Sequence, residues 1–255
     1  MQPNYQPIIR IIEEDYEMPQ LGRRRRISAL LPHDYETSEK YYPVLYLHDG
    51  QNLFDENAPY GNWAIDKSLT QLRKEGHGEV IIIAIDHGEK DRISEYSPFP
   101  SERFGAGQGI LYLRFLLETL KPYVDRTFRV LSDGANTGIG GSSMGGLFSL
   151  FAGLRRPDVF SKMMIFSPSL WIAPRIYKMA QRFQPVGQSL MYLYSGEKES
   201  PTHHTNIEVF IAYLKMNNLS EDQFKKQLVI NPQGTHSEYY WSREFPVALK
   251  WLFNQ

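Results

Sequence analysis

A short glycine-rich segment carries the residue types that could attack a carbonyl group. Residues 141–145 read Gly-Ser-Ser-Met-Gly and match G-x-S-x-G, with Ser143 at the central position. In this pattern a sharp turn between a strand and a helix presents the serine hydroxyl, and the glycines leave room for a strained backbone and close helix packing. The N–H of Met144 would then point to the carbonyl oxygen, where negative charge develops. The segment therefore predicts a serine nucleophile at Ser143.

The residues on either side of this segment fit the required turn. Residues 136–140 are small and partly apolar, as in a buried central strand. Apolar side chains then recur at helical spacing at Leu147, Phe151 and Leu154, and Pro157 ends the pattern. A Gly/Ser-rich hairpin or a phosphate-binding loop is the alternative. A phosphate loop would place lysine and then Ser or Thr after the glycines, and this sequence does not, so the context favours the nucleophile.

A late histidine is the candidate for the base that takes the proton from Ser143. His236 lies in a loop that contains Gly234, after the last predicted strand and before a helix. The order serine, acid, histidine along the chain is the one expected of an α/β-hydrolase. In that role the histidine accepts the serine proton and returns it to the leaving group. The alternative is a histidine in a surface loop.

The remaining histidines are weaker candidates. His48 ends a strand and is expected to lie in a pocket or in the core. His203 and His204 are adjacent, so on a helix they diverge and would not bind one metal ion as an i, i+4 pair does. No H-E-x-x-H segment occurs, so we expect no metal site. The three histidines expected in loops are His33, His77 and His87.

The third candidate is a carboxylate that follows the predicted strand at residues 190–194. Glu197 and Glu199 both stand there, and either could hold His236 in the correct tautomer and stabilise its protonated ring. The other would be a solvated loop charge. Ser-Pro at residues 200–201 is expected to begin a helix, with a serine cap and a proline in the first turn. An anion near a helix N-terminus is favoured in its ionised state, so this geometry favours Glu199.

Composition narrows the classes of function. The chain has 255 residues and 42% hydrophobic content, enough for one large α/β domain with a substantial core over residues 1–255. Its formal net charge of −1 gives no general attraction to nucleic acid or to anionic membranes. Without cysteine it has neither a disulfide framework nor a zinc–sulfur site, which fits a reducing compartment. We therefore expect no cofactor, no nucleic-acid partner and no membrane partner.

The N-terminal residues 1–15 bear on location. Their apolar run is interrupted by Arg10 and is followed by acidic residues. Such a run is neither the hydrophobic region of a signal peptide nor a membrane span. A cytoplasmic location is therefore expected, while the oligomeric state stays open.

Strands and helices alternate through most of the chain, which predicts a mostly parallel sheet with helices on both faces. Residues 1–31 are expected to join this sheet as two antiparallel strands, 8–13 and 25–31, connected around Gly22. The arginine run 23–26 is expected to be a solvated strand end rather than a polyanion site. In such sheets the functional site lies at the carboxyl ends of the strands. Further strands are expected at 44–48, 80–85, 162–166, 190–194 and 226–230, and helices at 63–73, 110–120 (ended by Pro122), from 200 onward and at 243–253.

Four separated blocks give the chain a resemblance to a known family. In chain order, they cover residues 46–54, 136–146, 194–199 and 234–241. On these blocks the chain from about Arg26 to Trp251 resembles the putative esterase family, the esterase D-like branch of the α/β-hydrolases. That branch includes enterochelin esterases, feruloyl and acetylxylan esterases, S-formylglutathione hydrolase and mycolyltransferases. The enterochelin-esterase-like subgroup is most similar, at residues 141–148 and around His236.

The resemblance implies an α/β-hydrolase fold and a serine carboxylic ester hydrolase that works through an acyl-enzyme without a cofactor. In the family, the backbone N–H after an Asp-Gly pair completes the oxyanion hole, which here implies Gln51 together with Met144. The acid block of the family has the spacing G-x-x-[DE], which selects Glu199 over Glu197. The implied catalytic residues are Ser143, His236 and Glu199.

Aromatic residues near the predicted strand ends are candidates for a substrate pocket. Such a pocket would accept a small-molecule or carbohydrate-linked ester, and core packing is the alternative role for each residue. Trp171 is the first candidate because it follows Ser-Pro-Ser directly after a strand. Two other functions stay open: a non-catalytic binding protein with this fold, and an acyltransferase that uses the same triad. The candidate pocket residues are Tyr60, Trp63, Trp171 and Trp241.

Overall fold

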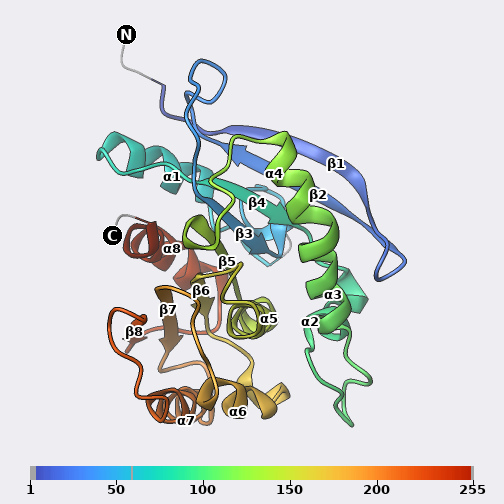
Figure 1. The fold of residues 1–255 in the computed structure, drawn as a ribbon, viewed down its shortest axis with the longest axis vertical. Coiled ribbons are helices and arrows are strands. Elements are labelled where there is room, and N and C mark those ends of the chain that lie inside the picture. Colours follow the sequence, from blue (N-terminus) through green and yellow to red (C-terminus); the bar gives the residue numbers. More distant parts are fainter. Residues whose placement is uncertain (1–3, 59, 254–255) are drawn as a thin grey trace.

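The sheet that the sequence predicts is present in the computed structural model, which describes residues 4–58 and 60–253 (Figure 1). Its strands are β1 (Ile8–Met18), β2 (Arg23–Leu31), β3 (Val44–His48), β4 (Ile81–Ile85), β5 (Thr137–Ser142), β6 (Lys162–Phe166), β7 (Ser189–Gly196) and β8 (Phe224–Asn231). Their order across the sheet is β1-β2-β4-β3-β5-β6-β7-β8. β2 pairs antiparallel with both β1 and β4, and all further pairs are parallel. This confirms the predicted fold class; residues 1–3 of the N-terminal segment lie outside the described part.

Helices cover both faces of the sheet (Figure 1). They are α1 (Ile65–Lys74), α2 (Arg92–Tyr96), α3 (Gly109–Phe115), α4 (Lys121–Thr127), α5 (Ser143–Arg155), α6 (Arg175–Gln181), α7 (His203–Lys215) and α8 (Glu238–Phe253). Successive side chains of a strand point to opposite faces. In β4, Ile82 and Ala84 pack in the core under α1 and α8. Ile81, Ile83 and Ile85 pack in the second core, under α2 to α7.

The predicted end of a helix at Pro122 is wrong. A π-helical segment, η3 (Leu116–Leu120), continues α3 directly into α4, which contains Pro122 near its start. Proline lacks an N–H and clashes with the carbonyl four residues earlier in a regular α-helix. The wider i→i+5 turn that precedes Pro122 accommodates the ring, because no i→i+4 bond has to be broken there.

The helix expected to begin at Ser200 begins later. α7 starts at His203 with Thr202 as its N-cap, and the carbonyl of Ser200 accepts the His203 N–H at 3.2 Å in the preceding turn. Ser200 is therefore not the cap residue. Because the field of a helix dipole falls off within one turn, the expected support of Glu199 by the start of α7 is weaker than predicted.

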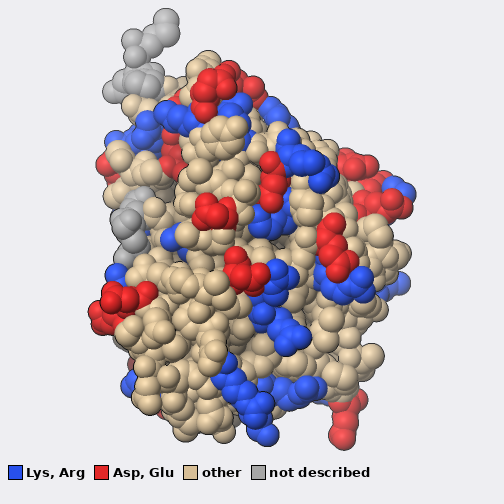
Figure 2. Space-filling model, in the orientation of Figure 1, with Lys and Arg blue, Asp and Glu red and all other residues tan. Residues whose placement is uncertain are grey.

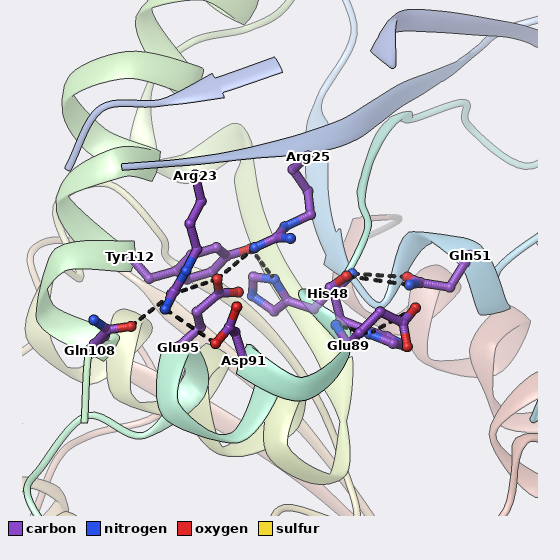
Figure 3. A network of polar contacts seen from close by, with 10 residues as sticks. Arg23, Arg25, His48, Gln51, Glu89, Asp91, Glu95, Gln108 and Tyr112 are labelled. Atoms are coloured by element: carbon purple, nitrogen blue, oxygen red, sulfur yellow. Dashed lines mark hydrogen bonds and ion pairs between the residues drawn. The ribbon is translucent and has the colours of Figure 1, made fainter. Parts of the chain in front are cut away.

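Acidic and basic side chains lie next to one another over much of the face in Figure 2. The arginines of β2 are paired with carboxylates as well. Arg23 and Arg25 reach toward Glu95 on α2, with Nη–Oε distances of 2.8 and 2.6 Å (Figure 3). Arg26 is ion-paired and half-buried as well, and Arg24 is the member of the run with a mostly exposed side chain. The expected solvated strand end is thus wrong, because carboxylates distant in sequence cover this part of β2.

Candidate active site

Ser143 lies at the turn between β5 and α5, at the carboxyl end of a central strand. Its φ of 56° is in the left-handed region, which costs a residue other than glycine roughly 1–2 kcal/mol. A Cβ at Gly145 would lie 3.1 Å from both Asp49 Oδ2 and His48 Cβ, so glycine is needed for α5 to approach the end of β3. The strand, the turn and the helix predicted around Ser143 are all present.

Two neighbouring strands end in the same strained way. Asp49 follows β3 with a φ of 60°, and Ser167 follows β6 with a φ of 44°. β3, β5 and β6 are adjacent and parallel, so these residues and Ser143 lie along one edge of the sheet. Left-handed residues other than glycine persist only where the surrounding structure holds them, and they concentrate at functional sites. This edge is where a parallel sheet is expected to bind its ligand.

Glu199 is the carboxylate that contacts His236. His236 Nδ1 lies 2.7 Å from Glu199 Oε2, and the side chain of Glu199 is 2% exposed, whereas Glu197 is exposed. An ionised carboxylate can only accept, so Nδ1 must carry the hydrogen and donate it. Nε2 of the neutral ring is then the acceptor. The structure thus brings one of the two candidate carboxylates, Glu199, to His236.

Neutral donors hold the second oxygen of Glu199. Ser167 Oγ donates to Glu199 Oε1 at 2.6 Å, and the Gly196 N–H donates to the same oxygen at 2.7 Å. Burial by itself raises the pKa of Glu199. The hydrogen bonds from His236, Ser167 and Gly196 outweigh burial, so the pKa of Glu199 is lowered and the carboxylate is ionised at neutral pH.

Trp241 joins this cluster from α8. Its Nε1–H donates to Ser167 Oγ at 2.9 Å, so the Ser167 hydroxyl links the indole to Glu199. The Trp241 ring also meets the His236 ring edge to face, with centroids 4.9 Å apart. The ring therefore contacts His236 directly and Glu199 through Ser167, although the sequence indicated only a pocket or core position.

His203 was not expected near the site. Its Nε2 lies 3.2 Å from Glu199 Oε2, without the angle of a hydrogen bond. Burial lowers the pKa of His203 despite the nearby carboxylate, so its ring stays neutral and does not cancel the charge of Glu199. The four-residue spacing of Glu199 and His203 is the only signal in the sequence that could have indicated this contact.

Ser143 and His236 line the same hollow of about 600 Å³. Ser143 Oγ bonds Ser169 Oγ at 3.3 Å rather than His236 in this state. Catalytic hydrogen bonds are often formed only when substrate is bound, so a shared hollow is compatible with proton transfer. The other lining residues are Asp49, Asn52, Tyr60, His87, Glu89, Lys90, Arg92, Ser142, Glu238 and Trp241.

The loop after β3 is fixed beside Ser143. Arg92 donates two hydrogen bonds of 2.7 Å to Asp49, from Nε and Nη2 to the two carboxylate oxygens. Burial raises the pKa of Asp49, but Arg92 outweighs it and the pKa is lowered. Gln51 follows in a short 3₁₀ helix, η1 (Gly50–Asn52), and its side-chain oxygen accepts the His87 N–H at 2.9 Å. The backbone N–H groups of Gln51 and Met144 stand at helix starts, where helices leave donors without internal partners.

The aromatic candidates divide between pocket and core. Tyr60 and Trp241 line the hollow. Trp63 is 3% exposed and stacks on Phe166 in the core, so its expected pocket position has to be corrected: its ring packs between the sheet and α8. Trp171 is 49% exposed, lies beside Phe104 and is not among the residues that line the hollow.

His48 is a core residue, one of the two positions expected for it. It is 1% exposed, and Nδ1 lies 3.2 Å from Tyr112 Oη. Burial lowers its pKa to about 4. One group of possible metal ligands occurs among the described residues, at His33, Asp34 and Glu79, but His33 Nδ1 already bonds Glu79 Oε1 at 2.7 Å and the group lies apart from Ser143.

Comparison with known proteins assigns the family. The sequence model of the family described as Putative esterase matches residues 18–252. The chain belongs to this family. The esterase is 27% identical over 244 residues to the uncharacterized protein YbbA of Bacillus subtilis, covering 91% of this chain and 93% of that protein. It is 26% identical over 227 residues to the ferri-bacillibactin esterase BesA of the same organism, covering 78% of this chain and 71% of BesA.

A solved structure has the same fold. The BES protein from Bacillus cereus superposes with a TM-score of 0.75 over 99% of this esterase and 96% of that chain, at 18% identity. The predicted class is therefore confirmed: the chain is a carboxylic ester hydrolase with the α/β-hydrolase fold. Within the described residues, no helix is both long and apolar enough to cross a membrane.

Proposed function

We propose that the esterase hydrolyses small carboxylic esters through an acyl-enzyme formed on Ser143. His236 acts as the base, Glu199 orients His236, and the N–H groups of Gln51 and Met144 bind the oxyanion. The observation that carries the proposal is the 2.7 Å contact between His236 Nδ1 and a buried, ionised Glu199, beside the hollow that Ser143 and His236 line.

In the first half of the reaction, Ser143 Oγ attacks the carbonyl carbon and its proton passes to Nε2 of His236. Nδ1 is unavailable because it donates to Glu199. The carbonyl electron pair moves to the oxygen, which the two backbone N–H groups stabilise. The C–O bond to the alcohol then breaks, the leaving oxygen takes the proton from His236, and the acyl group stays on Ser143.

In the second half, water replaces the alcohol. His236 Nε2 takes a proton from the water as its oxygen attacks the acyl carbon. The bond from that carbon to Ser143 Oγ breaks, and the proton returns to Oγ. Oγ bonds Ser169 in the free enzyme, so the proposed first attack requires Oγ and His236 Nε2 to come within hydrogen-bond distance.

A small-molecule ester fits the size and lining of the hollow. Its volume of about 600 Å³ is within the range of small-molecule sites, roughly 300–1,000 Å³. Aromatic and basic side chains, among them Tyr60, Lys90 and Trp241, line it. The name of one relative, from Emericella nidulans, states a siderophore ester, so we include siderophore-type esters with aryl and carbohydrate-linked esters. Residues 1–255 would act as one domain, and a cytoplasmic location stays a prediction.

Labelling with a fluorophosphonate, followed by peptide mapping, tests the nucleophile. We expect one labelled peptide, with the label on Ser143 in the wild type and no label in Ser143→Ala. Ser142→Ala is the matched control, because Ser142 is the adjacent serine and also lines the hollow; it should still be labelled. An unlabelled wild type, or label retained in Ser143→Ala, contradicts the proposal.

A panel of p-nitrophenyl esters with short acyl chains then separates the alternative functions. Turnover well above the Ser143→Ala background is expected of an esterase. Turnover equal to that background would indicate a binding protein that keeps the fold. Product analysis with an added alcohol distinguishes hydrolysis, which releases the acid, from acyl transfer, which yields a new ester.

A further inference from the structure

A second hollow, of about 990 Å³, lies on the molecule apart from Ser143. The loop at residues 98–100, α3, the end of α5 and α6 form its walls, and it shares no lining residue with the hollow of Ser143. Most of its lining is aliphatic or aromatic, as in sites that bind the apolar part of a small molecule. The apolar lining residues are Pro98, Phe99, Pro100, Ile110, Leu113, Phe151, Leu154, Pro174 and Met179.

Four cations and no carboxylate complete this lining: Arg155, Arg175, Lys178 and Arg182. Arg175 and Lys178 lie three residues apart on one side of α6, and Arg182 follows directly after the end of that helix. Lys and Arg side chains gather over α5 and α6 in Figure 2.

These cations lack acidic partners, unlike the arginines of β2. None of the four forms an ion pair with a described carboxylate. Arg175 instead places its guanidinium 4.5 Å from the centroid of the Phe99 ring, directly over an apolar wall. Like charges placed together without counter-charge repel one another, and an anion bound among them removes that repulsion.

We propose that this hollow binds a small anionic amphiphile, namely a carboxylate with an alkyl or aryl body. The head group pairs with the cations of α6 and Arg155, and the body lies on the apolar wall formed by residues such as Phe99 and Leu154. A planar bilayer surface cannot fill a concave site, so the shape favours a single small molecule over a membrane. The proposal does not depend on the catalytic roles of Ser143 and His236.

Calorimetric titration with decanoate tests the proposal. We expect saturable binding of one decanoate per chain, at least about tenfold tighter than 1-decanol, because a tenfold change in Kd corresponds to about 1.4 kcal/mol, an amount that a charge-assisted bond supplies. Decyltrimethylammonium, which has the same alkyl chain and the opposite charge, should not bind. Equal affinity for all three compounds overturns the proposal.

Variants locate the binding site. Arg175→Gln/Lys178→Gln should raise the Kd of decanoate roughly tenfold, whereas Lys225→Gln/Lys226→Gln, the same charge change on β8, should leave it unchanged. Ile110→Ser, at a side chain that is 57% exposed, should weaken binding without unfolding the protein. An unchanged Kd in the α6 variant would put decanoate elsewhere and overturn the proposal. So would tight binding to phosphatidylglycerol vesicles in the absence of decanoate binding.

Discussion

Two buried glutamates of this esterase are held in opposite ways. Glu95, on α2, has a side chain that is 1% exposed and contacts the guanidinium groups of Arg23 and Arg25. Glu199, after β7, is 2% exposed and receives its hydrogen bonds from a hydroxyl, a backbone N–H and the ring of His236. Both carboxylates avoid the cost of a buried, unpaired charge.

Because its partners are cations, Glu95 has a structural role, whereas the mostly neutral donors of Glu199 leave it able to take part in a reaction. Two cations cancel the charge of Glu95 and tie β2 to α2, the helix that also supplies Arg92 to the loop after β3. Neutral donors keep Glu199 ionised without cancelling its charge, so this charge remains available to stabilise a protonated His236. Loss of Glu95 should therefore affect stability first, and loss of Glu199 should affect turnover first.

The largest effect is expected for Glu199→Gln. It should lower kcat by about four orders of magnitude, as loss of the triad carboxylate does in a serine protease, because an amide cannot select the same tautomer of His236. Glu197→Gln, two residues away on an exposed side chain, should change kcat little. Rates on a p-nitrophenyl ester, with circular dichroism to check the fold, measure both; the opposite ranking would make Glu197 the acid.

Glu95→Gln should destabilise the protein by about 3–5 kcal/mol, the usual cost of removing one partner of a buried ion pair. It leaves Arg25 without its carboxylate partner, while Arg23 keeps its contact with Asp91. Urea unfolding measures the change in free energy of unfolding. Glu118→Gln, which breaks an exposed ion pair with Arg114, is the control and should produce no measurable change; equal effects would mean that the Glu95 cluster is dispensable.

Ser167→Ala should reduce kcat by roughly tenfold to a hundredfold, the range expected for a hydrogen bond to a charged group. The loss of this donor raises the pKa of Glu199, so the acid limb of the pH–rate profile should move to higher pH. Ser195→Ala is the control, since Ser195 is equally buried and its Oγ has no hydrogen-bond partner in the described part of the chain. A lower kcat with an unmoved acid limb would argue against a role through Glu199.

His48→Gln should have the smallest effect and should change stability rather than turnover. The pKa of His48 is about 4 in the folded protein and about 6.5 in an unfolded chain, so the unfolded state binds more protons between these values. The free energy of unfolding therefore does not depend on His48 above pH 6.5. As the pH drops from 6.5 toward 4, His48 lowers the free energy of unfolding by up to about 1.4 kcal/mol per pH unit. Urea unfolding at several pH values should give a shallower slope for the variant; identical slopes would contradict the buried neutral ring.

The sequence predicted the parts of the site that depend on local pattern. Strand periodicity and the glycine spacing around Ser143 identify a strand, a turn and a helix, which arise from short-range backbone geometry. The loop position of His236 and the acid before α7 follow from chain order. The strands therefore appear where expected, with β3 and β6 at their predicted bounds.

Contacts between distant segments could not be predicted in this way. The sequence of the charge run 23–26 predicts a solvated segment, whereas in the structure α2 places Glu95 against it. Nothing in the sequence around Ser167 indicates its hydrogen bonds to Glu199 and Trp241, which join three separate segments. Trp63 and Trp241 both stand in the sequence near predicted strand ends. Only the packing shows that Trp63 fills the core and that Trp241 supports His236.

The three left-handed residues at the strand ends, Asp49, Ser143 and Ser167, bear on how this esterase can evolve. Glycine would relieve the strained backbone at each of them, but at Asp49 it would remove the ion pair with Arg92 and at Ser167 the hydrogen bonds to Glu199 and Trp241. At Ser143 it would remove the hydroxyl that attacks in the proposed reaction. A library selected for heat resistance alone would therefore be drawn toward glycine at Ser143, whose hydroxyl makes a 3.3 Å hydrogen bond to Ser169, and would lose activity as it gained stability. Selection for stability and selection for turnover therefore favour different residues at Ser143, so improved variants have to be screened for both properties together.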